Sequence, residues 1–422
     1  MTEGLQLPVG QVPVDWKVLS LKDVTSKIGS GSTPRGGASV YVEAGASFIR
    51  SQNVLDHGFS SDGLVRISEE AAYSLRGVEV FKGDVLINIT GDSILRTCIV
   101  PDEVLPARVS QHVAILRSNG LIEPQVLQKW LSLELMKDFM LGHSSGGTRK
   151  AVTKGDLERF PVPVPPLAEQ RAIAGVLGAL DDKIKSNRQR AELIDAILLY
   201  EYLLLLKRDD AKTVPLGALV KPALGGVWGS DNATEKEQLK VSCFRGVDLA
   251  SIARTEWPKP PTRWIREGQF APRKFGLGEI WLEGSGSFCG RSLLISESIQ
   301  QLFDEPVCYS NFVKRVVPIS DPRLSVVSWL ALRHAYNIGE VAQSRIGSAF
   351  PNLDLGALLS NTQVLVPDDS DLNKLCQLTE SRLDTQALRE NRTLSELRDT
   401  LLPELLSGRL RVKDAESMME NV

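Results

Sequence analysis

The chain has 422 residues, which at ~100 to 200 residues per domain indicates two to four domains. Apolar residues make up 42% and charged residues 24% of the chain, values typical of a soluble globular protein, and they exclude disorder as the main state. The net charge of -3 provides no overall attraction to nucleic acid or anionic lipid, so any binding of a polyanion must be local.

No segment is expected to cross a membrane or to direct secretion. The most apolar stretch, Leu193–Leu206, contains Asp195 and Glu201 and is shorter than the ~18 apolar residues that a bilayer requires. Residues 1–16 have no basic residue ahead of their apolar positions and no long apolar core, so we expect a cytoplasmic protein. The cysteines form no C-x-x-C pair and are expected to be reduced packing residues: Cys98, Cys243, Cys289, Cys308 and Cys376.

An internal repeat spans the chain and predicts its organisation. At one constant offset the aligned pairs are Leu21 with Leu216, Arg50 with Arg245, Gly83 with Gly278, Asp84 with Glu279, Gly91 with Gly286, and Arg96 with Arg291. The offset then drifts by a few residues, as small loop insertions would cause, and the pairs are Ser110 with Ser310, Trp130 with Trp329, Gly147 with Gly347, and Asn187 with Asn391. The order of the pairs is preserved over the whole length, which favours a repeat over chance matches.

The first half begins with short apolar runs broken by Gly, Ser and Asn, as at Asp84–Thr90, and this pattern predicts strands bounded by turns. A helix containing Trp130 follows. The proline-rich run Pro161–Pro166 then predicts a boundary, because proline removes backbone donors and fixes an extended path. A long helix is predicted after it, from Leu167 to about Lys207.

The second half repeats this layout of a globular segment followed by a helix. It has a predicted strand at Glu279–Glu283, a helix containing Trp329, a weaker boundary at Val364–Pro367 and a helix from about Asp371 to Leu402.

The first long helix carries the clearest periodicity in the sequence. Its apolar positions alternate in steps of four and three, which is a heptad seam, and Asn187 is a polar member of that seam. So narrow a seam needs a partner helix, and the second long helix offers one that could run antiparallel. The alternative is two unrelated amphipathic helices, each lying on its own domain. The seam positions are Ile173, Leu177, Leu180, Ile184, Asn187, Ala191, Ile194, Leu198, Glu201 and Leu205.

No motif in the sequence predicts catalysis. Gly284–Gly290 (GSGSFCG) imitates a dinucleotide-binding loop, but its third glycine is one place late, so a turn after a strand is the better interpretation. The chain has no G-x-x-x-x-G-K-[ST] run, and its four histidines lack metal-ligand spacing. Asp181 and Asp182 are expected on the solvated face of the long helix.

Loops rich in hydrogen-bonding side chains occur in both halves and suit DNA. Arginine reads guanine and Asn or Gln reads adenine in the major groove, while Gly, Ser and Thr let backbone amides approach phosphates. Ordinary solvated turns are the alternative. The candidate DNA contacts are Ser32, Thr33, Arg35, Arg50, Gln52, Asn53, Arg96, Arg149 and Lys150 in the first half, and Trp228, Arg245, Asp248, Arg291 and Arg345 in the second.

The run Pro165–Asn187 (PPLAEQRAIAGVLGALDDKIKSN) strongly resembles the central region of the specificity subunits of Type I restriction-modification systems. Pro13–Leu21 (PVDWKVLSL), Gly31–Pro34 (GSTP) and Ser407–Val412 (SGRLRV) also resemble recurrent pieces of that family. The resemblance covers nearly the whole chain. The second copy departs from it, because no PPLAEQ element follows Pro367.

The resemblance implies an α+β fold with two pseudo-repeated target-recognition domains joined by a pair of long antiparallel coiled-coil helices. The implied segments are 1–166 and 209–367 for the two domains, 167–208 and 368–406 for the helices, and 407–422 for a tail. Each domain would read one half of a bipartite DNA site, and the helices would set the spacing between the halves. Residues expected in helix register or subunit docking are Gln170, Asp181, Asp182, Asn187 and Asn391.

The resemblance also implies partners and cofactors. Two methyltransferase subunits would dock around the helices, and restriction-translocase subunits would join them in a complex that methylates DNA and defends against phage. The subunit itself would bind double-stranded DNA, have no active site and contact no membrane, and S-adenosylmethionine, ATP and Mg would belong to its partners. Two alternatives stay open: a two-domain scaffold whose loops bind protein, and a stand-alone hydrolase with an unrecognised site.

Overall fold

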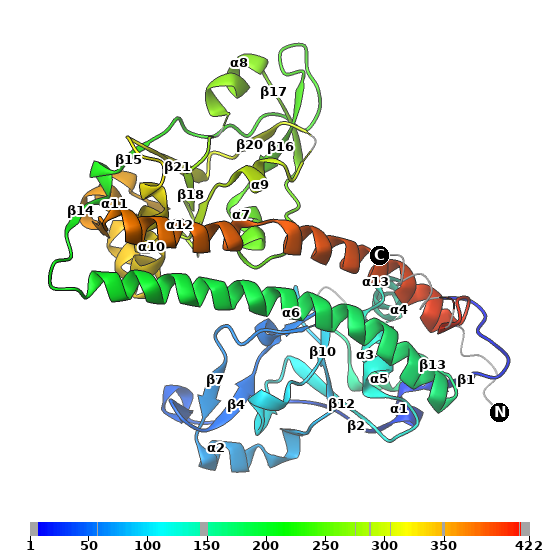
Figure 1. The fold of residues 1–422 in the computed structure, drawn as a ribbon. Helices are drawn as coiled ribbons and strands as arrows, with labels where there is room; N and C mark the ends of the chain where they lie inside the picture. Colours follow the sequence, from blue (N-terminus) through cyan, green and yellow to red (C-terminus); the bar gives the residue numbers. More distant parts are fainter. Residues whose placement is uncertain are drawn as a thin grey trace. The chain divides into compact units, whose positions relative to one another are not determined.

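The computed structural model describes residues 7–56, 58–143, 151–274, 276–286, 288–303, 305–347, 351–412 and 414 (Figure 1). The chain divides into two compact units, of which unit 1 comprises Met1–Asp182 and Ser395–Val422 and unit 2 comprises Lys183–Leu394. No helix in the described ranges is long and apolar enough to span a membrane.

The first repeat lies in unit 1. Its strands are β1 (Lys17–Ser20), β2 (Thr25–Ser30), β3 (Tyr41–Val42), β4 (Ala46–Ile49), β5 (Val54–Leu55), β6 (Gly58–Phe59), β7 (Val65–Ile67), β8 (Glu79–Val80), β9 (Val85–Asn88), β10 (Thr97–Ile99), β11 (Ala107–Val109), β12 (Val113–Ser118) and β13 (Pro161–Val164). Its helices are α1 (Leu21–Val24), α2 (Glu69–Ser74), α3 (Pro124–Ser132), α4 (Glu134–Gly142) and α5 (Lys154–Arg159), with 3-10 turns η1 (Gly37–Val40), η2 (Ser51–Asn53), η3 (Arg76–Val78) and η4 (Asp102–Val104).

The second repeat lies in unit 2. Its strands are β14 (Thr213–Pro215), β15 (Val220–Pro222), β16 (Leu239–Phe244), β17 (Thr262–Ile265), β18 (Ile280–Glu283), β19 (Ser292–Leu294), β20 (Val307–Tyr309), β21 (Val313–Pro318), β22 (Arg345–Ile346), β23 (Asn352–Leu353) and β24 (Gln363–Leu365). Its helices are α7 (Gly246–Ala253), α8 (Glu267–Phe270), α9 (Glu297–Gln300), α10 (Leu324–Asn337) and α11 (Leu355–Asn361), with η5 (Leu216–Ala218), η6 (Ala271–Arg273) and η7 (Glu340–Ser344).

The sheets of the two repeats follow one plan. A four-stranded sheet has the order β10-β9-β12-β2 in the first repeat and β19-β18-β21-β15 in the second. A second sheet contains the parallel pair β4–β11 in the first repeat and the parallel pair β16–β20 in the second. The predicted boundary segments overlap β13 and β24, which lie in the short antiparallel sheets β1-β13 and β14-β24. The prolines of β13 break no further ladder because only two strands are present. The internal repeat predicted from the sequence is therefore a repeat of topology.

Aligned acidic residues stabilise this arrangement of strands in both repeats. The Asp84 carboxylate accepts from the Phe81 backbone N–H at 2.8 Å and binds Arg117 of β12 through two hydrogen bonds of 2.8 Å. In the second repeat the Glu279 carboxylate accepts from the Gly276 N–H at 2.7 Å and pairs with Arg315 of β21 at 2.6 Å. Asp84 is fully buried, so the paired arginine offsets the cost of removing its charge from water.

The long helices match the prediction in part. Helix α6 (Leu167–Leu206) is continuous, whereas the predicted second helix is two helices, α12 (Asp369–Leu383) and α13 (Gln386–Ser407). Asp384 leaves the helical path with ψ of 123°, and its carboxylate accepts from the Gln386 N–H at 2.9 Å, which starts a new helix. After the break, Leu388 packs in the core with Phe244 and Trp281. Packing and side-chain capping thus override the helical pattern there.

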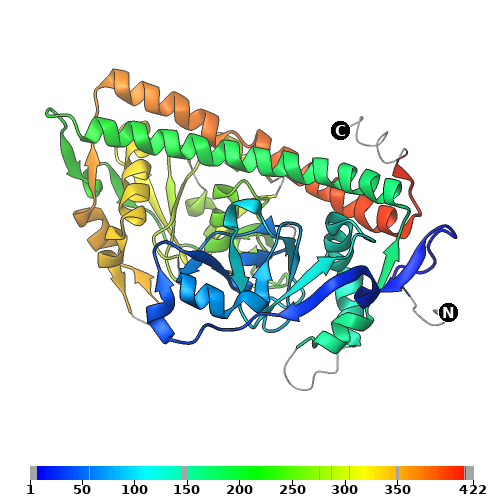
Figure 2. The same cartoon turned by 90° about the horizontal axis from the view of Figure 1, so that it is seen from below.

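Within each unit α6 runs antiparallel to its partner helix. In unit 2, Glu201 pairs with Lys374, Asp195 with Arg382, and Lys183 with Glu390, so numbers rise on α6 as they fall on α12 and α13 (Figures 1 and 2). The predicted α+β class, with two repeated globular parts and an antiparallel helix pair, is confirmed.

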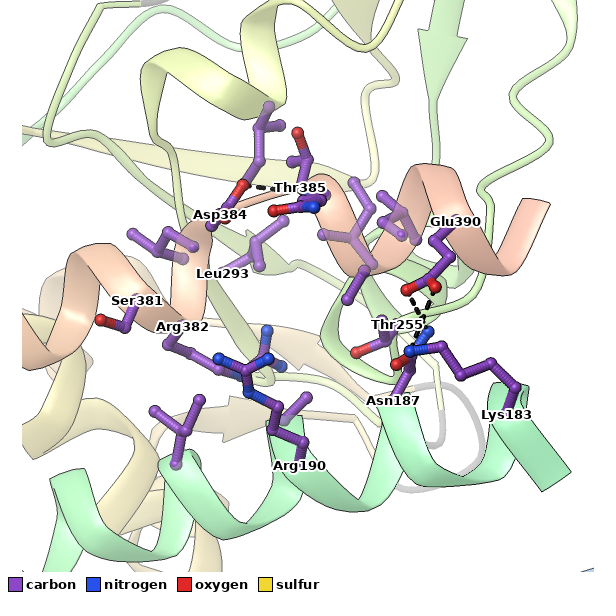
Figure 3. A pocket seen from close by; sticks show the side chains of 18 residues that line it. Lys183, Asn187, Arg190, Thr255, Leu293, Ser381, Arg382, Asp384, Thr385 and Glu390 are labelled. Carbon is purple, nitrogen blue, oxygen red and sulfur yellow. Dashed lines mark hydrogen bonds and ion pairs between the residues drawn. The ribbon is translucent and has the colours of Figure 1, made fainter. Parts of the chain in front are cut away.

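Asn187 and Asn391, which the repeat aligns, contact each other in unit 2. The Asn187 side-chain amide donates to the Asn391 side-chain oxygen at 2.8 Å. It also donates to the Glu390 carboxylate at 2.8 Å (Figure 3). The Asn391 amide donates in turn to the backbone carbonyl of Thr255 at 3.0 Å. Both asparagines are buried, and a polar pair in an apolar seam specifies register because any slip would leave it unpaired.

Carboxylates of α6 fasten each globular part to the helices. In unit 1, Asp181 forms ion pairs with Lys129 of α3 and with Arg398 of α13. In unit 2, Asp195 pairs with Arg333 of α10 at 2.6 Å and with Arg382 at 2.8 Å. The predicted place of Asp181 on the solvated face is therefore wrong, because a buried lysine requires that carboxylate.

The chain ends meet the start of α6 in unit 1. Glu169 accepts a hydrogen bond from the Trp16 indole N–H at 2.9 Å and pairs with Arg411 at 2.5 Å. Gly408 has φ +70°, and a Cβ there would lie 2.4 Å from the Pro13 ring. Three segments that resemble the family therefore meet at one site in unit 1: Pro13–Leu21, the start of Pro165–Asn187, and Ser407–Val412.

We expect Gly31→Ala to destabilise unit 1. The new Cβ would lie 1.9 Å from the Val109 carbonyl oxygen, and overpacking of this kind costs about 1–3 kcal/mol. Gly175→Ala is the matched control. It lies exposed in α6 with no atom within 4 Å of its new Cβ, and it should gain about 1 kcal/mol from helix propensity. Thermal unfolding that shifts both variants equally would contradict this account.

Candidate nucleic-acid interface

Four loops converge at one end of the sheets in the first repeat. The Gly31 N–H donates to Val113 at 2.9 Å and the Ser32 N–H to Val109 at 3.2 Å, so the loop after β2 lies against the β11–β12 turn. The Ser110 N–H donates to Ile49 at 2.9 Å, which adds the loop after β4. The Asn88 side-chain amide donates to the Ser51 carbonyl at 2.9 Å and adds the β9–β10 loop. We call these four loops the first loop cluster.

The second repeat builds the same cluster. The Val227 N–H donates to Tyr309 at 2.8 Å, and the Ser310 N–H donates to Phe244 at 2.9 Å. The Gly284 N–H donates to Phe312 at 2.7 Å and brings in the β18–β19 loop. We call these loops, with β22 and β23, the second loop cluster.

Ser32, Thr33 and Arg35 are exposed in the first loop cluster. The Thr33 hydroxyl donates to the Gln111 side-chain oxygen at 3.0 Å. No hydrogen bond or ion pair occupies the Arg35 guanidinium within the described ranges. Ser32 and Arg35 are therefore available to a ligand, and the Thr33 hydroxyl keeps its acceptor lone pairs.

Arg50 and Asn53 hold their loop together. The Arg50 guanidinium donates to the Gly63 carbonyl at 2.6 Å, and the fully buried Asn53 accepts from the Arg50 backbone N–H at 3.0 Å. Gln52 stays exposed and donates to the Asp62 carbonyl at 3.4 Å. The outward-facing residue of this loop is thus Gln52.

Arg245 and Asp248 are the second-repeat counterpart. The Arg245 guanidinium pairs with the buried Asp248 carboxylate at 3.0 Å and donates to the Lys259 carbonyl at 3.0 Å. Asp248 also accepts from the Arg245 backbone N–H at 2.8 Å. Both side chains thus stabilise the start of α7.

Arg96 and Arg291, which the repeat aligns, differ in their surroundings. Arg96 is exposed, and among the described residues nothing pairs with its guanidinium. Arg291 pairs with Glu283 at 2.6 Å and stacks over the Phe288 ring at 4.5 Å. Burial raises the pKa of the Glu283 carboxyl, and the nearby Arg291 opposes that shift.

Trp228 and Arg345 complete the predicted set in the second repeat. The Arg263 guanidinium lies 4.4 Å from the Trp228 ring, and Arg345 lies 5.9 Å from the Tyr336 ring. Arg149 and Lys150 lie outside the described residues. The proposed DNA contacts of the whole set stay a prediction.

The β11–β12 turn belongs to the first loop cluster, although its residues are absent from the DNA contacts predicted from the sequence. It exposes Gln111 and His112, and the equivalent β20–β21 turn exposes Asn311 and Phe312. The alignment of Ser110 with Ser310 was the available signal, because each exposed pair directly follows that serine.

A family model for the Type I restriction modification DNA specificity domain matches residues 13–196. The MjaIX specificity subunit of Methanocaldococcus jannaschii is 20% identical over 439 residues and covers 98% of both chains. The EcoBI specificity subunit of Escherichia coli is 29% identical over 133 residues, which are 31% of this chain and 28% of that relative. This chain is thus similar to the DNA specificity subunits of Type I restriction-modification systems, over its first repeat by the domain model and over its whole length by the MjaIX relative.

A solved structure supports the fold of this specificity subunit. The S subunit from M. genitalium aligns with a TM-score of 0.50 at 15% identity and covers 93% of this chain and 96% of that one. The family model ends before the second repeat, where the PPLAEQ element is missing. The family predicted from the sequence is confirmed.

The remaining predicted residues of the specificity subunit lie on its helices. Gln170 is buried, accepts from the Glu123 N–H at 2.7 Å and donates to the Leu121 and Pro165 carbonyls, so it fastens the start of α6. Asp182 is exposed beside the paired Asp181. A docking role for these residues stays a prediction.

Other sites considered in the sequence have structural explanations. The run 284–290 lies in the connection between the antiparallel strands β18 and β19, which differs from the strand-to-helix setting of a dinucleotide loop. No group of His, Cys, Asp and Glu residues within the described ranges could hold a metal ion. The five cysteines are unpaired thiols, and burial raises the pKa of Cys98 to about 12.

We expect Glu283→Gln to strengthen DNA binding by the specificity subunit. Without the carboxylate, Arg291 could neutralise one more phosphate, which should steepen the slope of log affinity against log salt by about 0.9. The salt slope of the wild type should approach that of the variant as pH falls through the raised pKa of Glu283, because protonation removes the same charge. Glu267→Gln, at an exposed position of α8, is the control. Equal salt slopes for all three proteins at neutral pH would contradict this role of Arg291.

Proposed function

We propose that each loop cluster reads one half of a bipartite DNA site and that the subunit itself performs no catalysis. The observation that carries this proposal is the recurrence of one loop cluster, built by equivalent backbone hydrogen bonds, in both repeats of a DNA specificity subunit. Loops on a rigid sheet suit recognition because they can change sequence while the scaffold holds their position.

The predicted DNA contacts divide into two groups by their surroundings. Arg35, Gln52 and Arg96 face outward and are proposed to meet bases or phosphates, as are Ser32 and Thr33 beside them. In the second repeat we propose this role for Arg291, Arg345 and Trp228. Arg149 and Lys150 remain candidates from the sequence alone. For Arg50, Asn53, Arg245 and Asp248, the hydrogen bonds above favour holding the loops in shape.

The helices are proposed to set the distance between the half sites and to dock two methyltransferase subunits. Asp182 and the other exposed positions of α6 are the surface offered to them. Restriction-translocase subunits would join this complex in defence against phage. S-adenosylmethionine, ATP and Mg would be bound by these partners, and the complex would act in the cytoplasm, where its DNA substrate lies.

Adding the chain to its methyltransferase subunits tests the proposal. The purified chain alone should not methylate DNA, and the reconstituted complex should methylate one bipartite sequence. Its log affinity should fall linearly with log salt, since phosphate contacts release counterions. A scaffold that binds protein through these loops would give neither result, and S-adenosylmethionine turnover by the chain alone would overturn the non-catalytic role.

We expect Arg96→Ala and Arg245→Ala to fail in different ways. Loss of Arg96 should weaken binding of the complex by about 1–3 kcal/mol if it reads a base, and one position of one half site should relax. Loss of Arg245 leaves the buried Asp248 carboxylate without its partner, so the unfolding temperature should fall. Competition binding and thermal unfolding of both variants check this. Equal unfolding temperatures would remove the structural role of Arg245.

We expect the helix pair to act as a ruler. Four residues inserted after Lys185 in α6 and four after Arg392 in α13 should add about one turn, or about 6 Å, to both helices. The half sites should stay unchanged while their spacer grows by about one or two base pairs of ~3.4 Å. Inserting into α6 alone is the control, and it should disturb the Asn187–Asn391 register. Methylation mapping reads the spacer, and an active complex with the original spacer would contradict the ruler.

A further inference from the structure

The β11–β12 turn and the β20–β21 turn are built alike. The Val113 N–H donates to the Ser110 carbonyl at 3.0 Å, and the Val313 N–H donates to the Ser310 carbonyl at 3.0 Å. Each turn therefore presents two exposed residues after a buried serine. The first exposed residue carries a primary amide in both repeats: Gln111 in one and Asn311 in the other.

Glycines bring a supporting loop against each turn. A Cβ on Gly31 would lie 2.4 Å from the Ser110 carbonyl oxygen, and a Cβ on Gly226 would lie 2.2 Å from the Ser310 carbonyl oxygen. Such close backbone approach holds both turns at a fixed position in their loop clusters. A fixed position is what reading of a base by a short side chain requires.

Gln111 is also oriented by its neighbours. Its side-chain oxygen accepts from the Thr33 hydroxyl at 3.0 Å, and His112 contacts the Thr90 hydroxyl at 2.7 Å. An amide oxygen has two lone pairs, so Gln111 can accept one further hydrogen bond while its NH₂ group donates. That donor and acceptor pair matches N7 and N6 of adenine in the major groove.

Asn311 lies in a different chemical setting. It borders a hollow of about 490 Å³ together with Gly225, Lys314 and Ile346, and within the described ranges no hydrogen bond occupies its side-chain amide. The Phe312 ring beside it is 65% exposed, so its face is open to a ligand. An exposed phenylalanine can contact the methyl group of thymine, which no other base presents.

We propose that Gln111 and Asn311 each read one adenine, in separate half sites, and that Phe312 contacts a thymine methyl group beside the Asn311 base. This inference rests on the proposed function. It adds residues that contribute to specificity at one equivalent position of both repeats.

Methylation mapping of the reconstituted complex tests the two amides. Gln111→Ala should relax one A·T position in one half site, and Asn311→Ala should relax one A·T position in the other. Binding to the original site should weaken about 5- to 150-fold in each case. Gln125→Ala on α3 and Gln377→Ala on α12 remove exposed amides elsewhere and should change neither half site.

Binding to synthetic duplexes tests Phe312. Replacing thymine by deoxyuridine through the second half site should weaken wild-type binding at one position, and Phe312→Ala should abolish that sensitivity. Three mapping results for Gln111→Ala and Asn311→Ala would overturn the proposal. Both variants could keep the wild-type recognition sequence, both could relax the same half site, or relaxation could occur only at G·C positions. Complete loss of specific binding with a wild-type unfolding temperature would also overturn it, because one amide cannot account for so large an effect.

These outcomes are separate from failure of the proposed function. If the wild-type complex methylated no defined sequence, bipartite recognition itself would be wrong. If the wild type is specific and the amide variants match the Gln125 and Gln377 controls, only the assignment of Gln111 and Asn311 fails.

Discussion

The antiparallel pairing of α6 with α12 and α13 is the constraint on which the rest of the structure depends. Apolar contacts alone would tolerate a slip of the seam, whereas buried polar groups do not, because a slip leaves them desolvated without partners. Asn187 and Asn391 fix the register in unit 2, and Asp181 and Asp195 each tie a globular part to both helices of the pair. Burial lowers the pKa of Lys129 and Asp181 opposes that shift, so each charge stabilises the other in this partly buried pair.

The two repeats share a scaffold and differ where they would meet a ligand. Asp84 with Arg117 and Glu279 with Arg315 make the same bidentate contact between a turn and a strand. At the loop clusters the aligned positions diverge in chemistry, from the exposed Arg96 to Arg291, which pairs with a carboxylate. This division lets recognition change without loss of the fold, since the pairing of strands does not depend on the exposed side chains.

A net charge near zero is compatible with DNA recognition here because many basic side chains are already neutralised inside the protein. Arg117, Arg315, Arg382 and Arg398 all pair with carboxylates within their own unit. Exposed cations outside these pairs, such as Arg35 and Arg96, are the ones offered to a polyanion. Total composition counts both groups equally, so it gives no measure of the local field at a loop cluster.

The sequence by itself determined the repeat, the class of fold and the family. Aligned residues such as Asp84 and Glu279, or Asn187 and Asn391, form hydrogen bonds that hold the scaffold, so they stay alike where the exposed loops differ. The heptad seam of α6 could also be recognised from the sequence, because a helix that packs along its whole length must repeat its apolar positions.

Tertiary structure alone decided which polar residues are free. Arg96 and Arg245 look alike in sequence, yet one guanidinium is exposed and the other is held by Asp248 and the Lys259 carbonyl. Asp181 and the break at Asp384 were misjudged for the same reason, since Lys129 and the core around Leu388 lie far away in the chain. The local sequence shows which hydrogen bonds and ion pairs a residue can form. Only the partners that the fold places beside it decide whether those interactions are already formed.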